Sequence, residues 1–279
     1  MQTPLLKDIT PSDDLKEYVR KYQVFRFLFD TSASPPVKFH APRPEHSITF
    51  YIKDAQKFSY LNSPLISTYP ICVINGMYTI PVQRYGGNDF WAIKVVLQPS
   101  TLYHLINIPL PEITNNYINA EDVWRNKIRL VCEQLSGLDD LCEMLSVIET
   151  FLRQVIGNKT KEKDPIDKVS NLLINMESGA SLHWLAGQSC LSMRQFIRKF
   201  EIRTGISAKT FQRIIRFDKA FRMKNIHPDL DWLSIALRCD YHDYQHLAKD
   251  FNEFTQLTPP AFYKLEKTSP ERSFGLVEA

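Results

Sequence analysis

The segment SLHWLAGQSCLSMRQFIRKFEIR, residues 181–203, contains two short helical patterns separated by a tight turn. Ser181 can cap the first helix and Ser192 the second, because a serine side chain accepts a hydrogen bond from a free N–H group at a helix start. Two short helices joined in this way are typical of a helix-turn-helix unit. The first turns of the second helix of such a unit lie against base edges in the major groove of DNA.

The same pattern recurs about 50 residues later, in residues 231–254. A longer helix, predicted to begin after a cap at Ser207, connects the two copies. The segments TGISAKTF and TQLTPPAF also correspond. We interpret this internal repeat as two similar docking modules. The matching positions of the two copies are Ser181, Leu185, Ala186, Phe196, Phe200 and Phe211 in the first, and Asp231, Ile235, Ala236, Leu247, Phe251 and Phe262 in the second.

Charge is distributed unevenly along the chain, although the net charge is only +3. Residues 192–225 contain ten Lys or Arg and two acidic residues, which gives +8, whereas residues 226–279 contain five and nine, which gives −4. A basic segment on a helix-turn-helix frame indicates binding to the phosphate backbone of DNA. A basic helix face that is merely solvated is the alternative, and the repeat makes it the less favoured one.

The spacing of Phe196 and Phe200 predicts which side of the second helix is buried. Arg194, Ile197 and Arg198 are then left on the side that can face base edges, and arginine pairs with both acceptors of guanine. Basic residues nearby would neutralise phosphates without reading sequence. The predicted phosphate contacts are Ser192, Lys199, Lys209, Arg213 and Arg216.

On these motifs, residues 164–264 resemble the DNA-binding domain of the AraC/XylS family of transcription regulators. The resemblance implies a sequence-specific regulator that binds a double-stranded DNA operator, with RNA polymerase as a possible further partner. It places base-facing residues of the second unit at Tyr244, Gln245 and Lys249. Two family glycines are Asp240 and Gln256 here. Because Asp tolerates positive φ better than most residues, we expect the turn at Asp240 to survive.

The N-terminal half carries short β-rich runs between residues 20 and 97, namely VFRFLF, SITFYI, ICVI and FWAIKVVL. They predict a sandwich or barrel, followed by two helical patterns that would cover it. This half resembles the cupin-like sensor domains that precede the module in many relatives. We therefore predict an α+β multidomain chain: a β-rich sensor or dimerisation domain at 1–157, a linker at 158–164 and a DNA-binding domain at 165–279, with helix-turn-helix units at 181–203 and 231–254.

The resemblance implies a small-molecule effector, a homodimer contact, or both, for the N-terminal half. Tyr78, Arg84 and Trp91 are candidates to line an effector pocket, as are Asn75 and His104. His40 and His46 flank the turn APRPE. They have no third ligand at metal-site spacing, so we interpret them as solvated loop histidines and expect neither a metal nor a cofactor.

A cupin-like small-molecule enzyme or binding protein with a helical appendage is the alternative function. The sequence contains no GxSxG, HExxH or phosphate-loop motif, and we expect the chain not to be an enzyme. Five scattered cysteines predict buried thiols rather than a disulfide framework. The start of the chain lacks the features of a signal peptide, and no long apolar run follows, so we expect a cytoplasmic protein with no membrane contact.

Overall fold

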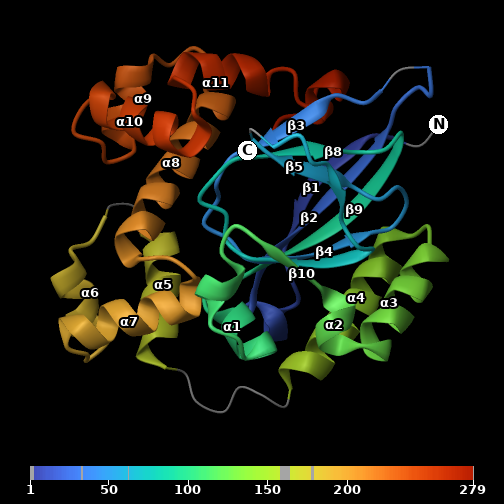
Figure 1. Ribbon diagram of the computed structural model, residues 1–279, viewed down its shortest axis with the longest axis horizontal. Helices are drawn as coiled ribbons and strands as arrows, with labels where there is room; N and C mark the ends of the chain where they lie inside the picture. The colour runs from blue at the N-terminus through green and yellow to red at the C-terminus, as the bar shows by residue number, and fades with distance from the viewer. Residues whose placement is uncertain (1–2, 33, 62, 158–163, 177–178, 279) are drawn as a thin grey trace.

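The computed structural model describes residues 3–32, 34–61, 63–157, 164–176 and 179–278. A β-rich N-terminal part is followed by an all-helical C-terminal part, which confirms the predicted fold class. In Figure 1 the helical part stacks along α8 on the left, and the sheets lie on the right. The predicted linker falls almost entirely within residues 158–163, outside the described residues.

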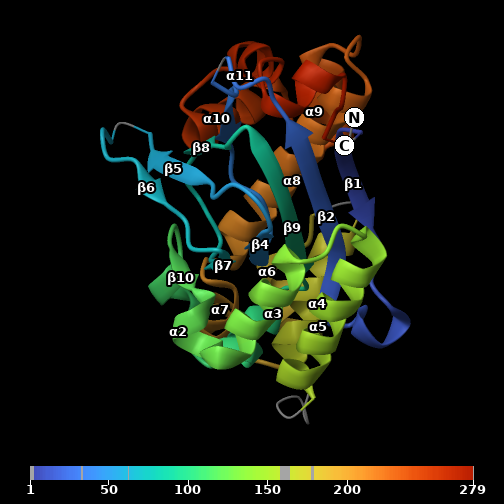
Figure 2. The same cartoon turned by 90° about the vertical axis from the view of Figure 1, so that its right-hand side faces the viewer.

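The larger sheet has six antiparallel strands in the order β1-β2-β9-β4-β7-β10. The four β-rich runs of the sequence lie in β2, β4, β7 and β9. Figure 2 shows β1, β2 and β9 side by side. The bounds are β1 (Leu5–Ile9), β2 (Val19–Leu28), β4 (Ser47–Tyr51), β7 (Cys72–Asn75), β9 (Asp89–Leu97) and β10 (Tyr117–Asn119).

The smaller sheet has four antiparallel strands in the order β3-β8-β5-β6. Its bounds are β3 (Val37–His40), β5 (Lys57–Tyr60), β6 (Ser67–Thr68) and β8 (Val82–Tyr85). Within the described residues no strand of one sheet pairs with a strand of the other, so the N-terminal part consists of two sheets rather than a closed barrel.

The alternation of side chains along β9 separates two apolar clusters. Trp91, Ile93 and Val95 pack with the helices that follow the sheet, whereas Phe90 and Ala92 pack toward the opposite face. The covering helices bury Ile128, Val131 and Leu135 in the first cluster, as their spacing predicts. These N-terminal helices are η1 (Asp13–Leu15), α1 (Thr101–Ile106), η2 (Leu110–Ile113), α2 (Ala120–Trp124), α3 (Asn126–Ser136) and α4 (Leu141–Ile156).

The C-terminal part contains both copies of the predicted repeat, connected by the long helix α8. Every apolar position named for the repeat is buried in the C-terminal core. No helix within the described ranges is both long and apolar enough to cross a membrane. The helices are α5 (Pro165–Asn175), α6 (Leu182–Gln188), α7 (Met193–Thr204), α8 (Ala208–Ile226), α9 (Trp232–Arg238), α10 (Tyr244–Thr255), α11 (Pro259–Glu266) and η3 (Pro270–Phe274).

Two turns of the second unit adopt left-handed backbone without glycine. Asp240 has φ +59° and Gln256 has φ +60°. The expectation that the turn at Asp240 survives is therefore confirmed. Gly205, with φ +85°, directly follows α7 in the first copy of the repeat. Gln256 holds the equivalent position directly after α10 in the second copy.

The C-terminal core continues onto the N-terminal part. Phe39 of β3 packs edge-on against Phe262 of α11, with ring centroids 5.9 Å apart. At the other end of the helical part, the Thr114 hydroxyl donates a hydrogen bond to the Gly205 carbonyl oxygen at 2.8 Å. The N-terminal part thus contacts the helical part at two places, directly after α7 and at α11.

We predict opposite effects for two substitutions at these equivalent positions. Gln256→Gly should raise the free energy of unfolding by about 0.5–1 kcal/mol, because relief of left-handed strain exceeds the entropy cost of glycine. Gly205→Ala should lower it by about 2 kcal/mol or more, because the new Cβ would lie 2.7 Å from Thr114 Oγ1 and 3.1 Å from the Leu110 carbonyl oxygen. Chemical denaturation of the full chain measures both. The same sign for the two variants would contradict the prediction.

Candidate nucleic-acid interface

The first helix-turn-helix unit positions α7 through its caps and its buried face. Ser192 and Gln195 form a reciprocal capping box at the start of α7, which satisfies N–H groups that the helix itself leaves free. Phe196 and Phe200 are fully buried, as predicted. Arg194 and Arg198 are exposed, and their side chains form no ion pair with any described residue.

Ile197 is also exposed, at 42%. It lies between the two arginines on the outward face of α7. An exposed apolar group there is suited to contact the methyl group of thymine.

The second unit presents α10 in the same manner. Asp243 accepts a hydrogen bond from the backbone N–H of His246, and Asp231 does the same for Ser234 at the start of α9. Gln245 and Lys249 are exposed, whereas Tyr244 is half-buried against the C-terminal core. Both units therefore hold a capped second helix whose first turns face outward.

The predicted phosphate contacts divide into two groups. Lys209 is exposed at the start of α8. Lys199 lies 3.2 Å from an Asp164 carboxylate oxygen and remains partly exposed. Ser192 is exposed, and its hydroxyl is used in the capping box.

Arg213 and Arg216 are instead engaged within the protein. Arg213 pairs with Asp250 at 2.8 Å and with Glu253 at 2.5 Å, so that α8 is tied to α10. The hydrogen bond to Glu253 raises the pKa of Arg213. Arg216 donates a hydrogen bond to the Asp240 carbonyl oxygen at 3.2 Å. The sequence does not reveal the pairing of Arg213 with Asp250 and Glu253, because these partners lie 37 and 40 residues further along the chain.

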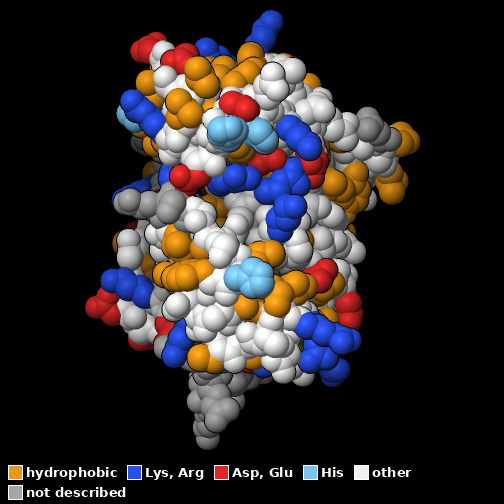
Figure 3. Space-filling view, turned by 90° about the vertical axis from the view of Figure 1, so that its left-hand side faces the viewer, with side chains coloured by type: hydrophobic (Ala, Val, Ile, Leu, Met, Phe, Trp, Pro, Cys, Tyr) orange, Lys and Arg blue, Asp and Glu red, His pale blue; other side chains and the backbone are white. Residues whose placement is uncertain are grey.

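Figure 3 views the helical side of the molecule, which is on the left in Figure 1. Lys and Arg side chains gather across the middle of this face with some Asp and Glu side chains among them, and hydrophobic groups and histidine lie around them. The mixture of basic and apolar groups on one face suits a duplex, whose backbone is anionic and whose bases carry apolar edges.

The N-terminal part contains a cavity of about 70 Å³ between the two sheets. Of the three predicted pocket residues, only Arg84 lines it. Trp91 lies on the other face of β9 with the Arg26 guanidinium stacked on it, and the Tyr78 ring is buried beside Tyr69. Sequence reasoning missed most of the lining, although the alternation of Phe25, Phe27 and Phe29 in and after β2 signals a common face. Other lining residues are Lys38, His40, Thr49, Tyr51, Phe90 and Lys94.

The interpretation of His40 and His46 as solvated loop histidines is wrong. Both side chains are buried, and burial lowers the pKa of each. His46 Nε2 lies 3.1 Å from the Thr204 carbonyl oxygen at the end of α7. His104, a further pocket candidate, instead contacts Asp167 at 3.0 Å on the first turn of α5.

The geometry defines a class of protein: one that presents two outward-facing helix-turn-helix units on a shared helix. Residues 185–264 match the family described as "Helix-turn-helix domain", and residues 7–119 match "Domain of unknown function (DUF6597)". The C-terminal part of this chain therefore contains a helix-turn-helix domain, a module that binds DNA.

A search of curated proteins finds no match. Among solved structures, the chain is similar to ToxT from Vibrio cholerae at 13% identity and a TM-score of 0.47, over 88% of this chain and 97% of that one. It is also similar to the DNA-binding domain of AdpA, a global transcriptional factor solved with a target DNA, at 23% identity and a TM-score of 0.35, over 38% and 95%. The AraC-like activator CuxR shows 11% identity and a TM-score of 0.26, over 79% and 88%.

We predict that Arg213 contributes to folding rather than only to DNA affinity. Arg213→Ala should lower the free energy of unfolding by about 2 kcal/mol, because it leaves the buried Asp250 carboxylate with a weaker partner. Lys209→Ala, a matched loss of an exposed cation on the same helix, should change it by less than about 0.5 kcal/mol. Urea unfolding of both variants measures the difference, and equal stabilities would argue against the pairing.

Proposed function

We propose that the chain is a sequence-specific regulator that reads duplex DNA through α7 and α10. The observation that carries this proposal is the presence of two capped helices on one scaffold whose first turns are exposed. In the first unit Arg194, Ile197 and Arg198 read bases, and in the second Tyr244, Gln245 and Lys249 do so. The helix-turn-helix match favours this function over the cupin-like enzyme considered from the sequence.

Phosphate contacts come first from Lys209, Lys199 and Ser192. Lys209 is exposed, and Lys199 lies one turn further along the groove helix than Gln195. Arg213 and Arg216 also lie near this surface, and they reach phosphates only by weakening their contacts with the second unit. Binding at these two residues therefore links DNA contact to the position of α10.

The N-terminal part, residues 1–157, senses an effector or a partner and transmits the signal through its contacts with the end of α7 and with α11. The cavity between the sheets supports an effector role, because ligand sites are concave and largely apolar with a few placed polar groups. Residues 165–279 form the DNA-binding domain in this proposal, with homodimer formation and RNA polymerase contact as further properties of the regulator.

We predict that Arg194→Ala and Lys209→Ala weaken DNA binding in different ways. Loss of Arg194 should relax the preference at one base pair by about 1–3 kcal/mol. Loss of Lys209 should weaken binding to all sequences alike and lower the salt slope by about one unit. Fluorescence anisotropy on selected and random duplexes over a range of salt concentrations measures both effects. If both variants lose affinity equally on the two duplexes, the assignment of roles fails.

We also predict that the first unit contributes more of the sequence information than the second. The second unit is acidic overall, and Asp231 and Asp243 are used as helix caps while Asp250 and Glu253 bind Arg213. These contacts offset only part of the repulsion from phosphates. Binding-site selection with the full chain should return one strong block of about 4–6 base pairs and a weaker one about a helical turn away. Two equal blocks, with Gln245→Ala as damaging as Arg198→Ala, would refute this asymmetry, and no selected sequence at all would refute the proposed function.

A further inference from the structure

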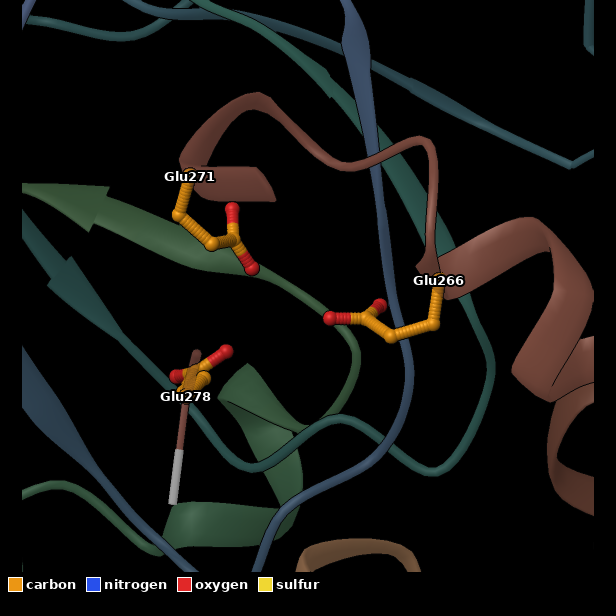
Figure 4. Close-up of side chains that lie close together, drawn as sticks. All are labelled: Glu266, Glu271 and Glu278. Atoms are coloured by element: carbon orange, nitrogen blue, oxygen red, sulfur yellow. The ribbon is translucent and has the colours of Figure 1, made fainter. Parts of the chain in front are cut away.

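Three buried glutamates converge where the end of the chain meets β3. Figure 4 shows the carboxyl groups of Glu266, Glu271 and Glu278 close together, from α11, η3 and the segment after η3. Their oxygens lie within 4.8 Å of one another. Such a group could hold a metal ion, but the Lys38 ammonium already lies 2.5 Å from Glu266, 2.5 Å from Glu271 and 3.4 Å from Glu278. The cation of this cluster is a lysine of the smaller sheet.

Residues 269–278, which include Glu271 and Glu278, are called the tail from here on. The tail makes two further contacts with the N-terminal part. Glu278 forms a bidentate pair with the buried guanidinium of Arg43. Burial opposes ionisation of Glu278, yet the attraction of Arg43 and Lys38 holds its pKa well below the usual range. The Phe274 ring stacks on Phe27 at 5.5 Å and contacts Phe29 at 5.0 Å between centroids. The tail thus inserts an aromatic ring and two carboxylates.

The tail forms one wall of the cavity between the sheets. Pro270, Glu271 and Glu278 line it together with Phe27 and Phe29, the two rings that contact Phe274. With the tail seated, the cavity volume is about 70 Å³. Pockets that hold organic ligands measure roughly 300–1,000 Å³. The cavity with its present lining is too small for a ligand of that size, and the tail supplies part of that lining.

The charges around the cavity indicate what would take the place of the tail. Lys38 and Arg43 receive carboxylates from the tail, whereas Lys94 is paired with Glu45 of the N-terminal part. Arg84 also lines the cavity, and its buried Nε has no hydrogen-bond partner within the described residues.

His40 adds a second unpartnered group. Its side chain is nine-tenths buried, it lines the cavity, and Nδ1 finds no partner within the described residues. Without the tail, Arg43 would lose its carboxylate partner and Lys38 would keep only Glu266, beside an aromatic wall that also carries Arg84. Such a site favours an anion with a flat apolar body.

We propose that the tail is an internal ligand of this cavity, and that the exogenous ligand is a small organic anion with an apolar ring that competes with Phe274 and Glu278 for the same contacts. The inference rests on the proposed effector role of the N-terminal part. The tail directly follows α11, which comes after the second helix-turn-helix unit and packs against its helix α10. Displacement of the tail removes its contacts with Lys38 and Arg43 and so loosens the attachment of this unit to β3.

The competition is tested with 3-phenylpropanoate, which combines a phenyl ring and a carboxylate, in calorimetric titrations of the full chain. Phe274→Ala combined with Glu278→Gln should bind this acid at least tenfold more tightly than the unmodified chain, because the variant tail no longer competes. Ser273→Ala, an exposed change within the tail, is the matched control and should bind like the unmodified chain. The uncharged 3-phenylpropanamide should bind the double variant at least tenfold more weakly than the acid. Equal affinity of the acid for the double variant and the unmodified chain, or equal affinity of acid and amide, overturns the proposal.

Hydrogen exchange on the unmodified chain provides a second measurement that requires no variant. The amides of Arg272, Gly275 and Leu276 are hydrogen-bonded within the tail region. A saturating concentration of 3-phenylpropanoate should accelerate hydrogen exchange in residues 269–278 at least fivefold. The uncharged 3-phenylpropanamide should leave the exchange rates unchanged. Unchanged exchange with the acid overturns the proposal. Neither measurement uses DNA. Failure of this proposal can therefore be distinguished from failure of the proposed DNA-binding function, which the binding-site selection tests.

Discussion

The relative position of α7 and α10 depends on the burial of aromatic rings of α8 against each of them. Phe211, in the first part of α8, packs against Phe200 of α7 at 5.6 Å between centroids. Phe217, in the middle of α8, packs against Phe251 and Phe254 of α10 at 4.7 and 5.5 Å. Burial of each such ring stabilises the fold by about 1.5–3 kcal/mol. One continuous helix thus holds both units through direct side-chain packing.

Electrostatics reinforces this arrangement and also limits it. The ion pairs of Arg213 with Asp250 and Glu253 connect α8 to α10. Without this pairing, DNA would attract the arginine and repel the two carboxylates. An arginine engaged in this way stabilises the free protein at the expense of its availability to phosphate. Because Asp250 is also bonded by the Tyr241 hydroxyl at 3.1 Å, its charge is turned inward, away from a duplex.

Features that depend on neighbouring residues were predictable from the sequence. The caps at Ser181, Ser192 and Asp243 and the buried pair Phe196 and Phe200 are examples, since each involves partners within a few residues along a helix. The matches between the two copies of the repeat extended these local signals to the second unit. The exposure of Arg194 and Arg198 follows from the same periodicity.

Features that depend on contacts between distant segments were not predictable. Trp91 was chosen as a pocket residue, but the pocket face of β9 is one residue out of phase and carries Phe90 and Lys94 instead. His46 lies in a Pro-rich turn that looks exposed, but the end of α7, more than 150 residues away, covers it. Periodicity along one strand gives no information about which of its faces meets a cavity or which loop is covered by another part of the chain.

The contacts that the tail makes with Lys38 and Arg43 join segments far apart in the sequence, and this separation affects the order of folding. Lys38 and Arg43 find their carboxylate partners 233 and 235 residues further along the chain. During synthesis these two cations therefore lack those partners until Glu271 and Glu278 have been made. Contacts of such high sequence separation form late and slowly. Docking of the tail onto β3 is accordingly a late step, and it completes the charge pairs of Lys38 and Arg43.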